Sequence, residues 1–516
     1  MRFSGEAGFL AFASLAVILL FVFFLSVPLF GDTLGYGYST VRWMRDNGYT
    51  PFAAGDGKGE QAMGHPTLFF WLWALISALL GETLATARLM PAVATFLSLW
   101  GMYRLGRRLA SPMAGWLAAL TLLASPLFLI QCMRPMPDSA VVAAVVWSLY
   151  FYVKDRYFPA ALLCALGVAF REQAIFLAAA FFLAELTETG VRRPGRLLLL
   201  SSPLLVIAFT GLVNLAVNGY FFFPTYTGEG SSLPQGWFLQ RIRLFGTHLL
   251  AEDHRWILVT AAVAGILRDR GRDRHSLPFI LALLFPALLP PPERLLFIAF
   301  AGLGVLVYMV RERLYTTKLS WVFILVPFFM VMFHVLIVMQ SPDPVLDLFR
   351  YVLPAYPFIL LGGVIMLFRY YSKKTAAVLG LVFLAGTAYS NRTIRRAAQP
   401  DTSLACAGIL MDYGEAVLYA ASLGDTVLVS DIDSSYFTSP ECGTVGAPVP
   451  VRNILQGGEL SDGVEYTLLV ATFMAAQGNL EIAEAMVPSG SRIVMLDEPI
   501  WNDGTNRVSV YRVIPR

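Results

Sequence analysis

The sequence predicts an α-helical polytopic membrane protein with about thirteen transmembrane helices and a small α/β domain at its C-terminal end. Of the 516 residues, 57% are apolar and only 14% are charged, whereas soluble globular proteins are about 25% charged. Many of the apolar residues form runs long enough to cross a bilayer core of about 30 Å. Charges gather between these runs and after residue 390.

Composition also excludes several classes of protein. The net charge of +3 is too small for a chain of this length to bind nucleic acid through its electrostatic field. The four cysteines include no C-x-x-C pair, which excludes a zinc ribbon or a disulfide-framed miniprotein.

The first apolar run, residues 8–28, has no small-residue cleavage site before Asp32, so we interpret it as a retained first helix. Two later runs, 158–170 and 173–186, are too short to span without help from neighbouring helices. The other predicted spans are 85–103, 113–131, 139–153, 197–217, 256–267, 277–290, 295–310, 319–339, 352–368 and 375–390.

The run 67–80 is ambiguous, because fourteen residues reach only about 21 Å as a helix. If it lies in the membrane interface, the arginine-rich loops all fall on one side, which the positive-inside rule makes cytoplasmic. A span here would instead put the Arg104–Arg108 cluster outside. We therefore predict an interfacial helix on the outer surface. This topology predicts a multi-pass protein of the plasma (inner) membrane, with a cytoplasmic N-terminus and a periplasmic or extracellular C-terminal domain.

The chain thus divides into a membrane domain, residues 1–390, whose first outer loop is 31–84, and an outer α/β domain, residues 391–516. In an oxidising compartment Cys406 and Cys442 could pair, or both could be buried free thiols, and the sequence leaves this open. Short β-branched runs in this domain predict strands at 426–430, 466–471, 492–496 and 507–513, and helical periodicity favours helices near 404–422 and 477–487.

Polar residues gathered on the outer face are the candidates for chemistry, since ionisable groups at membrane boundaries are costly. Two carboxylates near Arg and His side chains could deprotonate an acceptor and stabilise an anionic leaving group. The candidates in chain order are Asp32, Tyr36, His65, Arg134, Asp138, Arg350 and Tyr351.

Each candidate also has a structural explanation. Asp32 and Asp138 could cap helices, and a lone His65 before a proline could be a loop residue. Arg134 and Arg350 could anchor the chain at lipid headgroups, and Arg171 could form a local ion pair with Glu172. His334, inside a predicted span, is interpreted as a packed, hydrogen-bonded residue.

Five stretches in the order found here resemble the GT-C glycosyltransferases of the protein O-mannosyltransferase and aminoarabinose lipid A transferase group. The resemblance covers roughly residues 8–370. The stretches are Asp32 after the first helix, Gly64-His65-Pro66-Thr67-Leu68-Phe69-Phe70-Trp71, Arg88-Leu89-Met90-Pro91 with Arg104-Leu105-Gly106-Arg107-Arg108, Arg134 to Asp138, and Arg350 to Pro357.

This resemblance implies a GT-C fold and an inverting transfer of a hexosyl or pentosyl group from a polyprenyl-phosphate sugar donor. In such enzymes the acid after the first helix is the principal catalytic carboxylate, which falls on Asp32, and Asp138 matches the second acid. The resemblance places His65, Arg350 and Arg171 at the donor phosphate. Tyr36, Arg134 and Tyr351 are candidates for substrate contact.

The chain departs from the family pattern where many relatives have Asp-Glu, because Thr33 follows Asp32. If the second acid of those relatives helps to hold a metal, this chain either lacks that metal ligand or supplies it from another residue. We predict no required cofactor, and the sequence leaves open whether the activity depends on a divalent metal.

A second reading, from another class, is a transporter or flippase of a lipid-linked sugar. It would favour ionisable residues near mid-bilayer and inverted repeats, neither of which the sequence displays apart from His334. A glycan polymerase or ligase would use a similar outer cavity. The residues do not identify the sugar, or decide among a lipid, a glycan and a protein acceptor.

Overall fold

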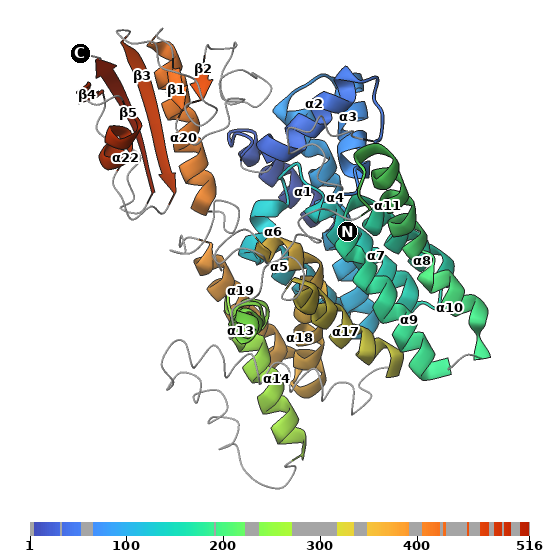
Figure 1. Cartoon of the computed structure of the whole chain (residues 1–516). Helices are drawn as coiled ribbons and strands as arrows, with labels where there is room; N and C mark the ends of the chain where they lie inside the picture. The colour runs from blue at the N-terminus through green and yellow to red at the C-terminus, as the bar shows by residue number, and fades with distance from the viewer. Residues whose placement is uncertain are drawn as a thin grey trace.

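The computed structural model describes a helical bundle and a smaller unit built around a five-stranded sheet (Figure 1). Every structural statement below concerns the described residues. These are 5–30, 33–52, 65–189, 192–221, 237–270, 317–334, 348–391, 405–423, 427–429, 451–453, 465–473, 479–487, 490–496 and 506–514.

The N-terminal half of the bundle is centred on the long helix α4, which packs against α1, α5 and α7. Hydroxyl caps define two of these helix starts: Thr83 accepts the N–H of Thr86 in α4, and Ser111 accepts that of Ala114 in α5. The helices here are α1 (Gly5–Phe24), α2 (Ser39–Asp46), α3 (Leu68–Leu80), α4 (Leu84–Leu109), α5 (Pro112–Ala124), α6 (Pro126–Gln131), α7 (Asp138–Val153) and α8 (Tyr157–Phe170), with the π-helical segment η1 (Thr33–Tyr38) before α2.

The second half adds helices that pack on this core, including α17 against α9 and α18 against α14 and α5. Two short 3-10 segments, η3 (Glu172–Ala174) and η6 (Leu348–Ala355), precede helices α9 and α18. The helices are α9 (Ile175–Thr189), α10 (Pro194–Ser201), α11 (Leu204–Asn218), α13 (Trp237–Leu250), α14 (Arg255–Arg270), α17 (Thr317–Phe333), α18 (Tyr356–Tyr370) and α19 (Lys373–Ser390).

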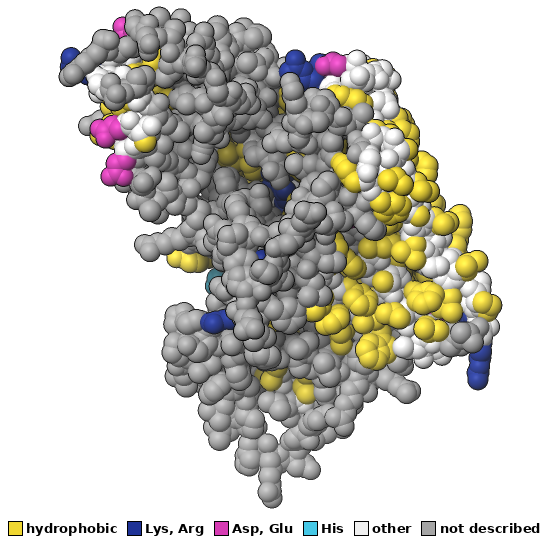
Figure 2. Space-filling model, viewed as in Figure 1, with side chains coloured by type: hydrophobic (Ala, Val, Ile, Leu, Met, Phe, Trp, Pro, Cys, Tyr) yellow, Lys and Arg dark blue, Asp and Glu magenta, His cyan; other side chains and the backbone are white. Residues whose placement is uncertain are grey.

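Among the described residues, four helical segments are long and apolar enough to cross a membrane. They are Gly5–Phe24, Leu84–Leu109, Pro194–Val217 and Arg350–Tyr370. Shorter apolar helices pack between them, and hydrophobic side chains cover the outer face of α8, α10 and α11 (Figure 2). This is the surface expected of an integral, multi-pass membrane protein, because a lipid-facing helix exposes apolar side chains.

Most predicted helices are confirmed, but proline divides two of the predicted spans. The run 113–131 forms α5 and α6, separated at Ser125 before Pro126. The run 197–217 is divided between α10 and α11, with Pro203 immediately before α11. The predicted spans 277–290 and 295–310 lie outside the described residues, so the count of thirteen stays a prediction.

Three segments differ from the predicted topology or confirm only part of it. The stretch 237–250, which lies between the predicted spans 197–217 and 256–267, is helix α13, and η1 and α2 occupy the first outer loop. The helix predicted at 67–80 is confirmed as α3, while its place in the membrane interface stays a prediction.

The C-terminal sheet has the strand order β2-β1-β3-β5-β4. Strand β1 is parallel to β2 and β3, whereas β5 runs antiparallel to both β3 and β4. Four strands coincide with predicted runs, and the short β2 was not expected. The elements are β1 (Val427–Val429), β2 (Val451–Asn453), β3 (Tyr466–Phe473), β4 (Arg492–Met495) and β5 (Asn506–Ile514), with α20 (Ala405–Ser422) and α22 (Asn479–Met486) packed on the sheet.

Helices α4 and α5 cross closely at Gly115. A Cβ atom added to Gly115 would lie 2.5 Å from the carbonyl oxygen of Tyr103 and 3.0 Å from the amide nitrogen of Arg107. Both obstacles are backbone atoms, so a side chain here must force the two helices apart.

We predict that Gly115→Ala lowers the free energy of unfolding by about 1–3 kcal/mol, the usual cost of overpacking. Denaturant unfolding of the purified protein in detergent measures it. Gly195→Ala in α10 is the matched control, because a Cβ there meets no atom within 4 Å. Equal stability of the two variants would contradict the close crossing.

Candidate functional site

The centre of the candidate site is the ring of Tyr351, in η6. The guanidinium carbon of Arg171 lies 4.2 Å from the ring centre and that of Arg350 lies 5.1 Å from it. The ring of His334 stacks on the same tyrosine with a centroid distance of 5.6 Å. Both arginines are buried. Two guanidinium groups at one aromatic ring form an electropositive, planar surface that suits a phosphate group.

Asp138 balances part of this positive charge. Its Oδ1 accepts a hydrogen bond from Nη1 of Arg171 at 2.5 Å, and the two side chains are only 2% and 7% exposed. Asp138 is the first residue of α7, but it does not act as the N-cap, which is Pro137. The capping explanation of Asp138 is therefore wrong. Oδ2 of Asp138 is buried and has no hydrogen-bond partner among the described residues.

In the short break between α8 and α9, the adjacent side chains of Arg171 and Glu172 contact different partners. Arg171 has an extended backbone (φ −161°, ψ 133°) and binds Asp138, whereas Oε1 of Glu172 lies 2.9 Å from Nδ1 of His65. Burial disfavours the charged form of Glu172, but His65 and Arg171 outweigh it and lower its pKa to about 2. Glu172, which sequence reasoning treated only as a neighbour of Arg171, thus belongs to the site.

Tyr36 joins the same group from η1. Its ring meets the ring of His65 edge-on at 6.1 Å and that of Phe70 at 5.1 Å. His65 is also in a loop, immediately before α3. The contacts therefore run without interruption from Tyr36 through His65 and Glu172 to the Arg171 region.

Arg134 links this region to the end of the first helix. Its Nε donates to Oγ1 of Thr33 at 2.7 Å, and its guanidinium carbon lies 4.7 Å from the ring centre of Phe30. Asp32 itself lies outside the described residues, between these two contacts of Arg134. The chain on both sides of position 32 is thus held by the loop that leads into Asp138.

Two adjoining cavities of about 290 and 270 Å³ lie beside His65. Both are lined by His65, Pro66, Thr210 and Asn214, and most of the other lining residues are apolar. Glu172 lines the second cavity and Tyr36 lines the first. A ligand with both a charged group and a hydrocarbon part matches this combination.

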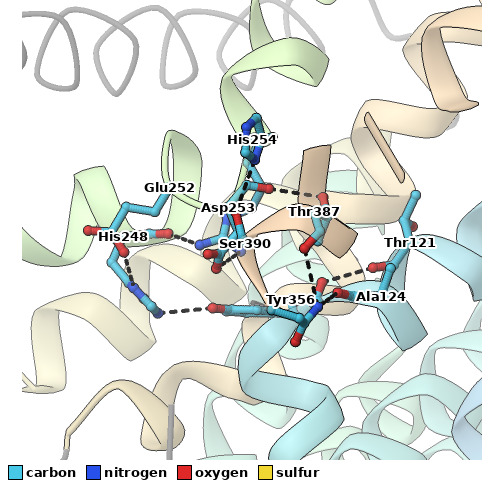
Figure 3. Close-up of polar contacts among 12 residues, drawn as sticks. Thr121, Ala124, His248, Glu252, Asp253, His254, Tyr356, Thr387 and Ser390 are labelled. Carbon is cyan, nitrogen blue, oxygen red and sulfur yellow. Dashed lines mark hydrogen bonds and ion pairs between the residues drawn. The ribbon is translucent and has the colours of Figure 1, made fainter. Parts of the chain in front are cut away.

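A second polar cluster fixes the segment that carries Arg350 and Tyr351 (Figure 3). The hydroxyl of Tyr356, the residue after η6, lies 2.9 Å from Nε2 of His248, whose Nδ1 lies 2.8 Å from Glu252. The guanidinium carbon of Arg255 lies 4.8 Å from the centre of the Tyr356 ring.

The turn between α13 and α14 is tied to α19 as well. Thr387 donates to the backbone oxygen of Asp253 at 3.0 Å, and Nδ1 of His254 lies 3.1 Å from the hydroxyl of Ser390 (Figure 3). Asp253 and His254 have positive φ angles of 50° and 63°, an unfavourable backbone that these bonds hold in place. The sequence did not indicate this cluster, because no helix is predicted between residues 217 and 256.

Among the described residues, no group of three or more His, Cys, Asp or Glu side chains is placed to hold a metal ion. Cys132 and Cys164 are buried free thiols, as expected for packing residues. Cys442 lies outside the part of the chain that the structure describes.

Comparison with known families decides the class of protein. Residues 64–221 match the family model PMT_2, described as dolichyl-phosphate-mannose-protein mannosyltransferase. We refer to residues 64–221 as the PMT_2 segment. The PMT_2 segment makes the chain a membrane glycosyltransferase of the GT-C type that uses a lipid-phosphate sugar donor. It contains His65, Arg134, Asp138 and Arg171, whereas Asp32, Arg350 and Tyr351 lie outside it.

Solved structures also resemble the chain. ArnT from Cupriavidus metallidurans bound to undecaprenyl phosphate is 14% identical, with a TM-score of 0.49 over 97% of each chain. The same protein in the apo state is 12% identical, with a TM-score of 0.49 over 99% of this chain and 98% of that one. The Archaeoglobus fulgidus oligosaccharyltransferase in the apo form is 14% identical, with a TM-score of 0.42 over 88% of this chain and 65% of its own. No curated protein matches the chain.

We predict that Arg171→Gln lowers the free energy of unfolding by about 3–5 kcal/mol, because it leaves the buried Asp138 carboxylate without a counter-charge. Denaturant unfolding measures the loss, and adding Asp138→Asn to the same chain should restore part of it. The control is Arg45→Gln, which breaks a partly exposed pair with Glu82 and should cost under about 1 kcal/mol. Similar losses in the two single variants would refute a special role for the buried pair.

Proposed function

We propose that this glycosyltransferase moves a hexosyl or pentosyl group from a polyprenyl-phosphate donor to an acceptor on the outer face of the membrane, with inversion. The observation that carries the proposal is the buried pair of guanidinium groups at Tyr351, beside the Asp138 carboxylate. The donor belongs to the lipid-phosphate class that the PMT_2 segment implies.

In this mechanism the donor phosphate binds at Arg350, Arg171 and His65. As the bond between the anomeric carbon and the phosphate oxygen breaks, the electron pair stays on the polyprenyl phosphate. The two guanidinium groups stabilise that negative charge, so the leaving group needs no proton.

Asp32 is the principal catalytic carboxylate of the proposal. It accepts the proton of the acceptor hydroxyl while the hydroxyl oxygen attacks the anomeric carbon from the side opposite the phosphate, which inverts the configuration. Support comes from the chain around position 32, which Arg134 holds against the loop leading into Asp138. Asp138 assists by fixing Arg171 through their hydrogen bond.

The cavities beside His65 suit the part of the donor nearest the phosphate, because their apolar lining can bury isoprene units next to a charged residue. Tyr36, Arg134 and Tyr351 are the proposed contacts with the sugar or the acceptor. The acceptor is a hydroxyl or similar nucleophile of a lipid, a glycan or a protein.

Replacing Asp32 with Asn should lower the transfer rate by about a hundredfold or more, since loss of a general base typically costs 10²–10⁴-fold. The assay follows radiolabelled sugar from a polyprenyl-phosphate donor to membrane acceptors. Asp46→Asn, an exposed aspartate in α2, is the matched control and should keep full activity. Full transfer by a folded Asp32→Asn protein would remove Asp32 from the mechanism.

The proposed orientation predicts which cysteines can be labelled in intact cells. In a chain without native cysteines, Asn47→Cys in the first outer loop should react with a membrane-impermeant maleimide. Arg193→Cys, before α10, should react only after the membrane is permeabilised. Both positions are exposed, so burial does not confound the comparison. The reverse pattern would put the candidate site on the cytoplasmic side.

A further inference from the structure

The contact between His65 and Glu172 joins two segments that are far apart in the sequence. His65 lies in the loop before α3, and Glu172 lies in the break between α8 and α9. Their side chains are 12% and 16% exposed, and Nδ1 and Oε1 are 2.9 Å apart. The contact therefore fixes the imidazole ring at the point where the two cavities adjoin.

Among the described residues, two ionisable ones line the cavities together with His65. Of the residues that line the two cavities with it, only Tyr36 from η1 and Glu172 from η3 are ionisable, while α11 contributes the neutral Thr210 and Asn214. Arg171, next to Glu172, directs its guanidinium to Asp138. The pKa of Glu172 is lowered, which favours its carboxylate form.

A carboxylate at Nδ1 has two physical effects on an imidazole. It accepts the Nδ1 proton, which fixes the orientation of the ring and makes Nε2 the second titrating atom. Its negative charge also favours the imidazolium over the neutral ring. An imidazolium donates from both nitrogens, whereas a neutral ring with its proton on Nδ1 presents only a lone pair at Nε2.

We propose that Glu172 is a positioning residue that holds His65 as an oriented imidazolium, so that His65 donates a hydrogen bond to the phosphate of the donor lipid. The proposal rests on the function proposed above, and assigns to Glu172 a part in donor binding rather than in the bond-breaking step. Because a phosphate also bears negative charge, it adds to the preference for the imidazolium once it is bound.

The test measures binding of farnesyl phosphate, a short polyprenyl phosphate, to the purified full-length protein by calorimetry between about pH 6 and pH 9. Glu172→Gln keeps the size and an acceptor oxygen but removes the charge. We expect its affinity to fall about tenfold at the alkaline end and to return toward that of the wild type at the acidic end. In turnover assays KM for the donor should rise while kcat changes little.

A lysine at position 65 separates this role from a purely structural one, because a lysine stays charged without help from Glu172. Donor binding by His65→Lys should be nearly independent of pH, and adding Glu172→Gln to it should change affinity less than about twofold. Glu172→Asp keeps the charge and should keep the wild-type pH profile. Glu188→Gln, an exposed acid on α9, is the matched control.

The possible outcomes distinguish failure of this inference from failure of the proposed function on which it rests. If the wild-type protein does not bind farnesyl phosphate, both the proposed function and the inference fail. If the wild-type protein binds but Glu172→Gln leaves the pH profile of binding unchanged, only the inference fails. The same holds if Glu172→Gln weakens binding equally in the wild-type chain and in the His65→Lys variant. A shifted profile with the His65 chain alone supports it.

Discussion

The buried hydrogen bond between Asp138 and Arg171 is the constraint on which the rest of the candidate site depends. Removing two charges from water is expensive, and the pair persists only where its geometry and neighbours compensate. Arg171 meets this condition by binding the carboxylate with Nη1 while its planar group rests on Tyr351. The helix start at α7, the break after α8 and the segment η6 must therefore keep one arrangement for the pair to remain satisfied.

A similar combination of arginine and tyrosine recurs at the end of η6. Tyr351 lies against Arg171, and Tyr356 lies against Arg255 and hydrogen bonds to His248. Tyr351 lies in the middle of η6 and Tyr356 directly follows this segment, so the two tyrosines restrain the backbone between residues 351 and 356. Such preorganisation matters for phosphate binding, since ordering a flexible loop would consume part of the binding energy.

Much of the fold could be predicted because hydrophobic run length and charge placement report directly on a bilayer. Strands β3 and β5 were predicted, at 466–471 and 507–513, because β-branched runs mark them. Helix α13 was missed since its residues 237–250 mix arginines and a histidine with apolar residues, and a search for apolar runs does not detect that pattern. Pro126 and Pro203 mark the two helix breaks in the sequence. Whether a proline ends a helix there depends on packing, which the sequence alone does not reveal.

The residues of the candidate site were predicted better than the contacts between them. Position in the chain selected Asp138, Arg350 and Tyr351, the family resemblance added Arg171, and the structure brings these four together. Their pairing could not be predicted, because Arg171 and Glu172 are adjacent and an ion pair between them was the simplest interpretation. The actual partners, Asp138 and His65, are distant in the chain and depend on how the helices pack. Asp32 was selected on the resemblance and stays a prediction.

Helix α11 forms a wall of both cavities and also exposes Phe209 and Leu204 on the apolar flank of the bundle. Helix α11 thus lies between the cavities beside His65 and the apolar flank of the bundle. For a substrate carried on a long isoprenoid, the proposed function implies sideways exchange: the headgroup and the isoprene units next to it enter the cavities past α11, while the rest of the tail stays dissolved in lipid. Departure of the spent carrier would then be limited by lateral diffusion, with no cost for bringing its chain into water.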